Sequence, residues 1–367
     1  MKILLVSPYF IDSFSSHISM GSAVKQAVNL SRQHQVIVLT CGRPEKYQRL
    51  NPHLEVISLP GWLIPDPVNY VISFPIISAF IHQLDTFQPD IVMFSKYMFF
   101  TSLLISLAKI KGYPVVTTTD TFPGINWFPR SKPVSAVMWL YARIIGLPLL
   151  WLSNKVILLH PGLEAVAKKY RLNTVNIPNG VDDTLLNAQP RPKDIIKPKG
   201  EFWIGFVGRP ESVKGIDLIL KVAKDLENLP RLKFIFIGGS PDKTRLEGNR
   251  LCLGFRYDVV NLYQFLDLLV LPSYSEGWPN VLLEAMAQKV PCLASNVGGI
   301  PYLIKHKQNG WLIPSGHAFK LRRAILYLYR HPSLRHRLGQ NGFETVANRF
   351  VWSKLLPQYQ ELFNRLQ

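Results

Sequence analysis

Short runs of isoleucine and valine recur along the first half of the chain, separated by segments long enough to form helices. These runs span residues 2–6, 36–40, 55–59, 91–94 and 115–119. Apolar runs of this length are typical of strands buried on both faces, with the intervening segments as crossover helices. Gly21 to Arg32 is the first predicted helix, since Ala23, Ala27 and Leu30 share one face at helical spacing. The pattern predicts a parallel α/β sheet.

The same pattern of short apolar runs recurs in the second half of the chain. The apolar runs there span residues 202–207, 233–237, 268–271 and 291–294. They predict a second Rossmann-like domain. Between the two halves, Pro190, Pro192 and Pro198 interrupt a stretch without any period, which is typical of a linker. We therefore expect an N-terminal domain over 1–185, a linker over 186–200 and a C-terminal domain over 201–345.

Two segments are unusually apolar, Val68 to Ile81 and Val134 to Leu152. A membrane-spanning helix needs about 20 consecutive, predominantly apolar residues. The first segment is short and contains Pro75, and the second contains Arg143, Gly146 and Pro148. Neither is expected to cross a bilayer.

Two interpretations of residues 134–152 remain open. The segment could form a helix buried under the N-terminal domain. Alternatively, it lies in a membrane interface, with Trp139, Tyr141 and Trp151 near the lipid headgroups and basic residues alongside. The charge of the chain favours the second interpretation.

Composition and charge narrow the classes of protein and partner. At 367 residues, with 47% apolar and 18% charged residues, the chain suits two ordered globular domains. The net charge of +18 favours polyanionic partners, namely nucleic acid, an anionic bilayer or phosphorylated small molecules. No run of five or six consecutive basic residues occurs, which disfavours nucleic acid.

Cysteines and histidines support neither a disulfide framework nor a metal site. The chain has only Cys41, Cys252 and Cys292, an odd number at wide spacings, which favours a reducing, cytoplasmic compartment. No histidine pair falls at metal-ligand spacing beside a carboxylate, so we expect no metal and no cofactor. The apolar run at the N-terminus is too short for a signal peptide and is expected to form the first strand.

The segment Pro272 to Ala287 carries the strongest local pattern of polar residues. A strand ends before it, a turn rich in Pro, Ser and Gly follows, and a helix begins near Asn280. Ligands of open α/β sheets bind where strands end, and the backbone amides of Gly277 to Val281 would suit phosphate or sugar oxygens. Glu276 and Glu284 could each accept two sugar hydroxyls. Alternatively, Glu276 caps the helix and Glu284 is a solvated surface residue.

This segment resembles glycosyltransferase family 4, whose members are retaining enzymes of the GT-B fold. Seven residues separate Glu276 from Glu284, with Gly277 after the first and Ala285-Met286-Ala287 after the second. Further similarity in order and spacing is carried by Val207-Gly208-Arg209, Lys214-Gly215, Ile177 to Asp182, Ser295 to Pro301 and Asn309 to Leu312. The resemblance implies an α/β fold of two Rossmann-like domains facing a central cleft. Residues 346–367 would form a C-terminal helix that crosses back to the N-terminal domain.

The resemblance also implies a role for each matched residue. Glu284 would bind the ribose hydroxyls and Glu276 the donor sugar. Arg209 and Lys214, which follow Gly208, would stabilise the negative charge of a departing nucleoside diphosphate without a metal, because guanidinium and ammonium groups suit phosphate oxygens. The alternative is an ordinary basic pair in a loop.

The chain departs from the family pattern mainly in its first domain. Family members place a His before an Asp after the fifth strand, whereas here Thr119 stands in the His position and Asp120 is retained. Asp120 would contact the sugar or the acceptor hydroxyl, or it caps a turn before Pro123. Gly21 and Ser22 would bring backbone amides close to the diphosphate, and Ser22 replaces one of two glycines usual there.

Together these features predict a retaining glycosyltransferase of the hexosyltransferase type. It would move a sugar from a nucleotide-diphosphate sugar to a glycan or lipid-linked acceptor, in the cytoplasm and peripheral on the inner face of the cell membrane. The alternative is a catalytically inactive protein on the same fold that binds carbohydrate or nucleic acid. The paired glutamates disfavour an epimerase or phosphorylase, and Ser7-Pro8-Tyr9 stands where an NAD enzyme would have a glycine motif.

Overall fold

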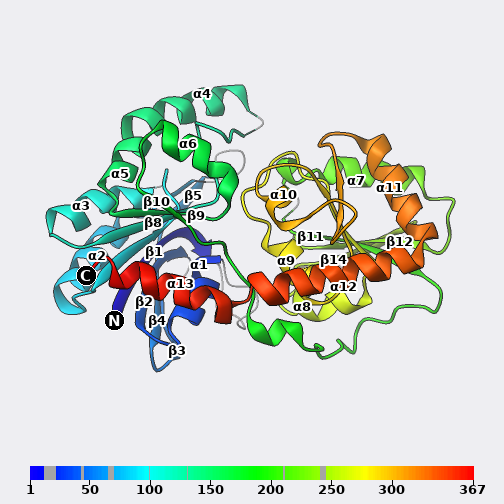
Figure 1. Ribbon diagram of the computed structural model, residues 1–367, viewed down its shortest axis with the longest axis horizontal. Helices are drawn as coiled ribbons and strands as arrows, with labels where there is room; N and C mark the ends of the chain where they lie inside the picture. The colour runs from blue at the N-terminus through cyan, green and yellow to red at the C-terminus, as the bar shows by residue number, and fades with distance from the viewer. Residues whose placement is uncertain are drawn as a thin grey trace. The chain divides into compact units, whose positions relative to one another are not determined.

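The computed structural model describes residues 1–11, 22–42, 45–64, 70–98, 100–129, 131–209, 211–239 and 245–367. These residues form two compact units, each with its own sheet and helices (Figure 1). The first unit comprises Met1–Pro178 and Leu356–Gln367, and the second comprises Asn179–Leu355. Each unit is described by itself below.

The first unit is built on an eight-stranded sheet in the order β10-β9-β8-β7-β1-β2-β4-β3. All neighbouring strands are parallel except β3, which runs antiparallel to β4 at the edge. The strands are β1 Lys2–Ile11, β2 Gln35–Gly42, β3 Lys46–Asn51, β4 Leu54–Leu59, β7 Ile91–Ser95, β8 Val115–Thr119, β9 Lys155–Leu158 and β10 Thr174–Asn176. A separate antiparallel hairpin pairs β5 Trp62–Ile64 with β6 Tyr70–Ile72. The five strands predicted from apolar runs are confirmed.

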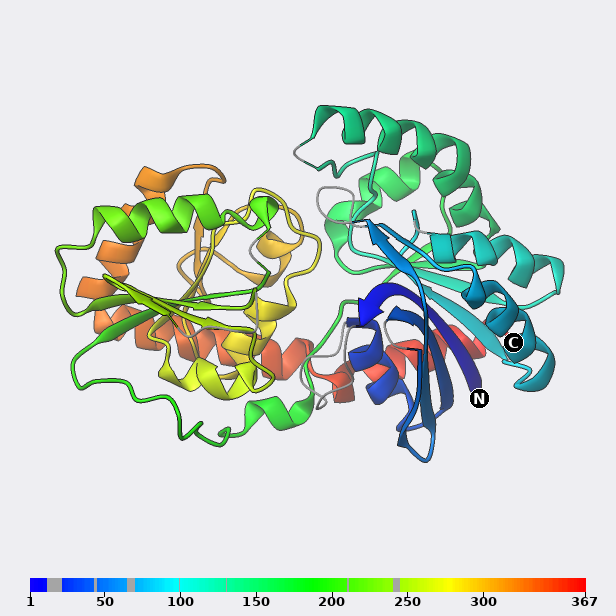
Figure 2. The same ribbon diagram turned by 180° about the vertical axis from the view of Figure 1, so that it is seen from behind.

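Helices cover both faces of this sheet. Alternate strand residues such as Leu4 and Val6 pack against Phe80 and Ile105, which belong to α2 Pro75–Thr86 and α3 Leu104–Ile110. On the other face lie α1 Ser22–Leu30 and the end of the last helix, α13 Trp352–Asn364, as Figure 2 shows from behind. The Gln26 amide of α1 donates a buried hydrogen bond of 2.8 Å to the Tyr359 hydroxyl of α13. The end of the chain therefore belongs to the core of the first unit.

One long apolar helix runs from Lys132 to Leu152 in the first unit. It comprises α4 Lys132–Tyr141, a π-helical turn over Ala142–Gly146, and α5 Leu147–Leu152. The wider π turn accommodates Pro148, whose ring would otherwise clash with the preceding turn. Among the described residues this helix is long and apolar enough to cross a membrane, by length and composition alone. Gly146 and Pro148 therefore lie within a continuous helix, and whether it crosses a bilayer stays untested.

The interpretation of this segment as a buried helix is wrong for most of its length. Only 28% of its most apolar window is buried, and α4 has no buried residue. The buried positions are confined to the π turn and α5. Met138, Tyr141 and Ile145 are partly buried against the core, whereas Val137, Trp139, Leu140, Ile144, Trp151 and Leu152 are exposed.

The second unit is built on a seven-stranded sheet in the order β13-β14-β12-β11-β15-β16-β17. The strands are β11 Phe202–Val207, β12 Leu232–Ile237, β13 Arg245–Glu247, β14 Arg250–Gly254, β15 Leu268–Leu271, β16 Cys292–Ser295 and β17 Trp311–Ile313. All pairs are parallel except β13 with β14. The four predicted strands are confirmed, and with the first unit they confirm two Rossmann-like units.

Helices also cover both faces of the second sheet (Figure 1). Phe202, Ile204 and Phe206 of β11 pack against α7 Ile216–Asp225 and α11 Ala318–Arg330. The other helices are α8 Val259–Leu262, α9 Asn280–Ala287, α10 Ile300–Leu303 and α12 Pro332–Arg349. The smaller helices of the first unit include α6 Glu164–Lys169.

The second unit begins at Asn179 and includes residues 186–200, which the sequence had suggested as a linker. Hydrogen bonds attach this stretch to the second unit. The Gln264 amide donates to the carbonyls of Gln189 and Pro190, and the Lys197 ammonium donates to the Phe265 carbonyl. These contacts fix the position of a proline-rich segment that forms no helix or strand of its own over residues 187–200.

Candidate functional site

Lys214 and Glu276 form the centre of the candidate donor site in the second unit. Lys214 follows β11 and Glu276 follows β15, and these two strands are neighbours in the sheet. The Lys214 ammonium lies 2.8 and 2.9 Å from the two carboxylate oxygens of Glu276. The Ser273 hydroxyl donates a further hydrogen bond of 3.0 Å to the same carboxylate. Since the Glu276 side chain is only 6% exposed, these contacts offset the cost of burying its charge.

A glycine holds the loop that carries Glu276. Gly298 has a φ of +53°, and a Cβ atom there would lie 1.7 Å from the Glu276 carbonyl oxygen. The neighbouring Gly299 amide donates to the Gly277 carbonyl at 2.9 Å. Only a residue without a side chain fits so close to this backbone. The Gly298-Gly299 pair after β16 therefore fixes the position of the Glu276 loop.

Glu284 lies on α9 and is 8% exposed. The Tyr263 hydroxyl donates a hydrogen bond of 3.0 Å to one of its carboxylate oxygens. Burial and the charge of Glu284 raise the pKa of Tyr263 well above its ordinary value, which keeps this hydroxyl a donor. The alternative of a solvated surface glutamate is therefore wrong. Glu276 does not cap α9 either, since that helix has no side-chain cap.

Arg209 follows Gly208 at the end of β11, on the same edge of the sheet as Lys214 and Glu276. Its guanidinium lies 3.0 Å from a carboxylate oxygen of Glu211, and its side chain is 70% exposed. The partner carboxylate of Glu211 is only 15% exposed, so the guanidinium also compensates a partly buried charge. Arg209 is nevertheless the most exposed of the four charged candidates.

The start of α9 offers polar groups beside Glu276. The Asn280 amide is already bonded to the Trp278 carbonyl at 3.1 Å, so it is not available to a ligand as expected. The side-chain oxygen of Asn280, however, is buried and has no hydrogen-bond partner in the described part of the chain. A buried acceptor is costly unless a donor reaches it. Gly277 and Val281, the other expected donor-binding residues here, are partly buried beside it.

Asp120 lies in the first unit, at the end of β8, and the structure pairs it with a residue that the sequence did not single out. The Lys96 ammonium, at the end of neighbouring β7, lies 3.0 Å from both carboxylate oxygens. Burial would raise the pKa of Asp120, but the charge and hydrogen bond of Lys96 outweigh it and lower the pKa below its ordinary value. Asp120 is therefore an ionised, partly buried carboxylate rather than only a turn cap.

A histidine completes this cluster. His160 follows β9, the next strand of the sheet, and its Nε2 lies 3.1 Å from the Asp120 carbonyl oxygen. Burial lowers the pKa of His160, against the opposing effect of Asp120, so the ring is neutral near pH 7. Lys96 adopts a left-handed backbone with φ of +79°, a conformation that costs energy in a non-glycine residue. The common signal that could have identified Lys96 and His160 is their position just after β7 and β9, the two parallel strands that flank β8 in the sheet.

Gly21 and Ser22, which were expected to bring backbone amides close to the diphosphate, do not test that expectation. Gly21 lies outside the described residues, and Ser22 begins α1 while its side chain is likewise not described. No group of three His, Cys, Asp or Glu is placed to hold a metal ion in the residues that the structure covers. Metal independence therefore stays a prediction.

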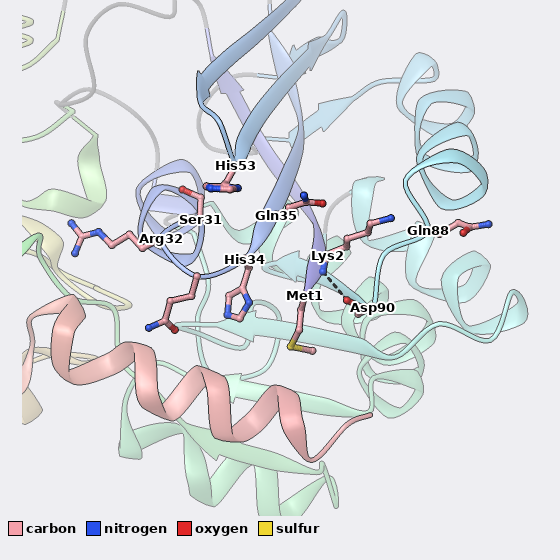
Figure 3. Close-up of a pocket in the computed structure, with 10 residues that line it drawn as sticks. Met1, Lys2, Ser31, Arg32, His34, Gln35, His53, Gln88 and Asp90 are labelled. Atoms are coloured by element: carbon pink, nitrogen blue, oxygen red, sulfur yellow. Dashed lines mark hydrogen bonds between the residues drawn. The ribbon is translucent and has the colours of Figure 1, made fainter.

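A polar hollow of about 660 Å³ opens at the opposite end of the first sheet (Figure 3). Lys2, Arg32, His53 and Asp90 are among the residues that line it, near the amino ends of β1 and β2. The Lys2 amide donates to the Asp90 carboxylate at 2.7 Å. Ligands of parallel sheets bind at the carboxyl ends of the strands, so this hollow is separate from the candidate site.

Solved structures share the fold over the whole chain. A sucrose-phosphate synthase from Thermosynechococcus elongatus matches with a TM-score of 0.79 at 20% identity, covering 100% of this chain and 98% of that one. An Anabaena protein solved in complex with UDP-glucose matches with a TM-score of 0.72 at 18% identity, covering 100% of both chains. At this level of identity the likeness confirms the GT-B fold.

Sequence relatives match over shorter stretches. The N-acetyl-alpha-D-glucosaminyl L-malate synthase of Bacillus anthracis is 31% identical over 140 residues, 36% of this chain and 37% of that protein. A putative teichuronic acid biosynthesis glycosyltransferase of Bacillus subtilis is 34% identical over 163 residues, 42% of this chain and 41% of that protein. The matches thus span less than half of either relative.

Two family models cover nearly the whole chain between them. The model described as Glycosyltransferase Family 4 matches residues 23–185, and the model described as Glycosyl transferases group 1 matches residues 189–345. Their boundary falls about ten residues after the start of the second unit at Asn179, and the second match contains all four charged candidates Arg209, Lys214, Glu276 and Glu284. The chain belongs to the glycosyltransferases of family 4.

Proposed function

We propose that this protein is a retaining glycosyltransferase of the hexosyltransferase type that uses a nucleotide-diphosphate sugar and no metal. The observation that carries the proposal is the buried Lys214–Glu276 pair at the carboxyl ends of two adjacent strands, with Arg209 on the same edge. The Anabaena neighbour was solved in complex with UDP-glucose, which supports a nucleotide-sugar donor.

The donor would be held by groups of opposite charge. An ammonium has three N–H donors and Glu276 takes two of them, so Lys214 can serve the carboxylate and a phosphate oxygen together. Arg209 would turn from Glu211 to the diphosphate. Glu276 would accept hydroxyls of the donor sugar, and Glu284 those of the ribose. As the leaving diphosphate gains charge, the two cations stabilise it more strongly than they do the intact donor.

The reaction would exchange one glycosidic bond for another on the same face of the sugar. The bond between the anomeric carbon and the phosphate oxygen breaks, and a bond to the acceptor oxygen forms. The acceptor proton passes to the departing phosphate oxygen, so no enzyme nucleophile is needed. Asp120, ionised beside Lys96, would accept a hydrogen bond from the acceptor or sugar hydroxyl.

The acceptor class we propose is a glycan or lipid-linked intermediate, used at the cytoplasmic face of the membrane. It is supported by the net charge of +18 and the exposed apolar helix Lys132–Leu152. The relative from Bacillus subtilis, a putative enzyme of teichuronic acid biosynthesis by its printed name, fits a polymer acceptor.

Turnover of a panel of nucleotide sugars tests the proposal. We expect release of one nucleoside diphosphate from one donor, measured by chromatography, with magnesium replaced by a chelator. Glu276→Ala should abolish release while an exposed variant, Asp225→Ala on α7, should not. Binding of nucleotide or sugar without any turnover would favour the inactive binding protein instead.

A further inference from the structure

The helix Lys132–Leu152 presents an apolar face to solvent although it belongs to a well-packed unit. Val137, Leu140, Ile144 and Trp151 recur at spacings of three, four and seven residues, which places them on one side of a helix. All four are exposed, Val137 by 70% and Ile144 by 62%. We call these four residues the apolar stripe. Contiguous exposed apolar surface of this kind marks an interaction site.

Contacts on the opposite side hold the helix firmly to its unit. Gly146 lies against Tyr97 and Met98, and a Cβ atom there would be 2.9 Å from the Met98 sulfur. The Arg143 guanidinium donates to the Gly124 carbonyl at 3.2 Å. The apolar stripe is therefore exposed because of how the helix is seated, not because the helix is loosely attached.

Aromatic and basic side chains surround the apolar stripe. Arg143 stacks on the Trp139 ring at 4.1 Å, and the Trp151 indole donates to the Tyr170 carbonyl at 2.8 Å. That second contact places the end of α6, with exposed Lys168 and Lys169, beside the stripe. Tryptophan at an apolar boundary flanked by lysine and arginine is the pattern that suits a membrane interface with anionic headgroups.

We propose that the apolar stripe, with Trp139 and the basic end of α6, lies on the surface of an anionic lipid bilayer. The helix would rest in the plane of the interface, its stripe among the acyl chains and Lys168 and Lys169 at the headgroups. This inference deepens the proposed function, on which its biological meaning rests, because it names the surface that meets a lipid-linked acceptor.

The position of the helix in the fold explains why this surface would serve the reaction. Gly146 packs on Tyr97 and Met98, which directly follow Lys96, and Arg143 binds the loop that follows Asp120. The helix therefore covers both loops of the Lys96–Asp120 pair. An acceptor anchored in the bilayer would be held close to the carboxylate that we assign to it.

Co-sedimentation with vesicles tests the inference. The wild type should bind vesicles that contain phosphatidylglycerol, bind pure phosphatidylcholine more weakly, and lose binding as salt rises. Leu140→Ser with Ile144→Ser should weaken binding by about tenfold or more for each side chain. Lys168→Gln with Lys169→Gln should weaken it by about fivefold for each charge, and only on anionic vesicles.

The matched control removes equally exposed apolar side chains from the second unit. Ile196→Ser with Leu246→Ser, at 83% and 65% exposed, should leave vesicle binding unchanged. Equal loss in both double variants, or no preference of the wild type for anionic vesicles, overturns the proposal. So does a change of molar mass in light scattering without a change in vesicle binding, because the stripe would then bind a second copy of the chain.

The outcome stays distinguishable from that of the proposed function. Circular dichroism shows whether each variant is folded, and thermal stabilisation by UDP reports separately on the donor site of the second unit. If no nucleotide binds while vesicles still do, the proposed function fails and the membrane surface stands. If nucleotides bind but the protein does not bind anionic vesicles, the membrane surface is ruled out and the proposed function stands.

Discussion

Charged residues in the two candidate sites occur as pairs. Glu276 is held by Lys214 and Ser273, and Asp120 is held by Lys96. A partly buried charge that loses its partner keeps its desolvation cost and loses the compensation. Substituting one member of such a pair therefore affects stability as well as chemistry, and each experiment needs a readout for both.

Replacing Lys214 with Met should separate these two effects. The variant leaves Glu276 buried with only the Ser273 hydroxyl, so we expect a loss of about 1.5–3 kcal/mol in the free energy of unfolding, measured with urea. Loss of a cation beside the leaving group should reduce kcat by about 10²-fold or more. Lys221→Met, on the exposed face of α7, is the matched control and should change neither quantity. Unchanged kcat in the Lys214 variant would remove it from the donor site.

The Lys96–Asp120 pair should show its effect in the pH dependence of stability. Because the pKa of Asp120 is lowered in the folded state, its ionisation stabilises the fold above about pH 4 and this contribution is lost as the pH falls through the folded pKa. At pH 7 we expect the free energy of unfolding of the wild type to exceed that of Lys96→Met by about 1.5–3 kcal/mol. This difference should shrink between about pH 5 and 3, as Asp120 becomes protonated.

An exposed pair provides the control for this pH series. Lys111 lies 2.5 Å from Asp85 on the surface of the same unit. Lys111→Met should cost less than about 1 kcal/mol at any pH, because solvent screens exposed pairs. Urea denaturation of both variants from pH 3 to 8 makes the comparison. An equal pH dependence in the two would show that Asp120 is no special carboxylate.

At the scale of elements, neighbouring parallel strands bring together residues far apart in the sequence. Lys214 and Glu276 are 62 positions apart, yet they meet because β11 pairs with β15. Lys96, Asp120 and His160 likewise follow three consecutive strands, β7, β8 and β9. The loops after these strands carry the site residues themselves, and Gly298 shows how closely one loop packs on another.

Gly298→Ala should therefore disturb the donor site from outside it. The new methyl group would meet the Glu276 carbonyl at 1.7 Å, and φ at this position is +53°. Gly200→Ala is the matched control, since φ there is +84° but nearby space is open. We expect the control to lose about 1–2 kcal/mol in the free energy of unfolding, from backbone strain alone. The Gly298 variant should lose a further 1–3 kcal/mol or so and weaken donor binding, as measured by urea denaturation and calorimetry. Equal losses of stability in the two variants would mean that the Glu276 loop moves aside for the methyl group without cost.

The apolar pattern of the sequence predicted the central strands well, because strands such as β1, β2 and β15 are buried on both faces and contain the runs ILLV, VIVL and LLVL. It did not predict β3 and β13, whose residues KYQRLN and RLE are polar because each is an edge strand with little burial. Burial of the helix Lys132–Leu152 could not be judged from its sequence, because an apolar composition fits a buried helix and an exposed apolar surface equally well. Glu276 and Glu284 were identified by their motif, but the pairing of Glu276 with Lys214 and of Glu284 with Tyr263 depends on tertiary contacts.

At the scale of the whole molecule, the candidate residues are distributed unequally between the two units. Arg209, Lys214, Glu276 and Glu284 all belong to the second unit, Asn179–Leu355, whereas Asp120 and the apolar stripe belong to the first. A ligand that recognises the four charged donor residues should therefore stabilise mainly the second unit. Free energy from binding appears as stability only in the part of the structure that must be folded to bind.

Hydrogen exchange with and without UDP tests this division. At a nucleotide concentration of about a hundred times its dissociation constant, we expect about 2.7 kcal/mol of added protection in core strands of the second unit, such as β11 and β15. Strands β1 and β8 of the first unit should gain much less. In Glu284→Gln the gain should shrink, because the amide loses an acceptor for the ribose hydroxyls. Equal protection of both units would show that nucleotide binding requires the first unit to be as fully folded as the second, and the donor site would then extend beyond the four residues identified here.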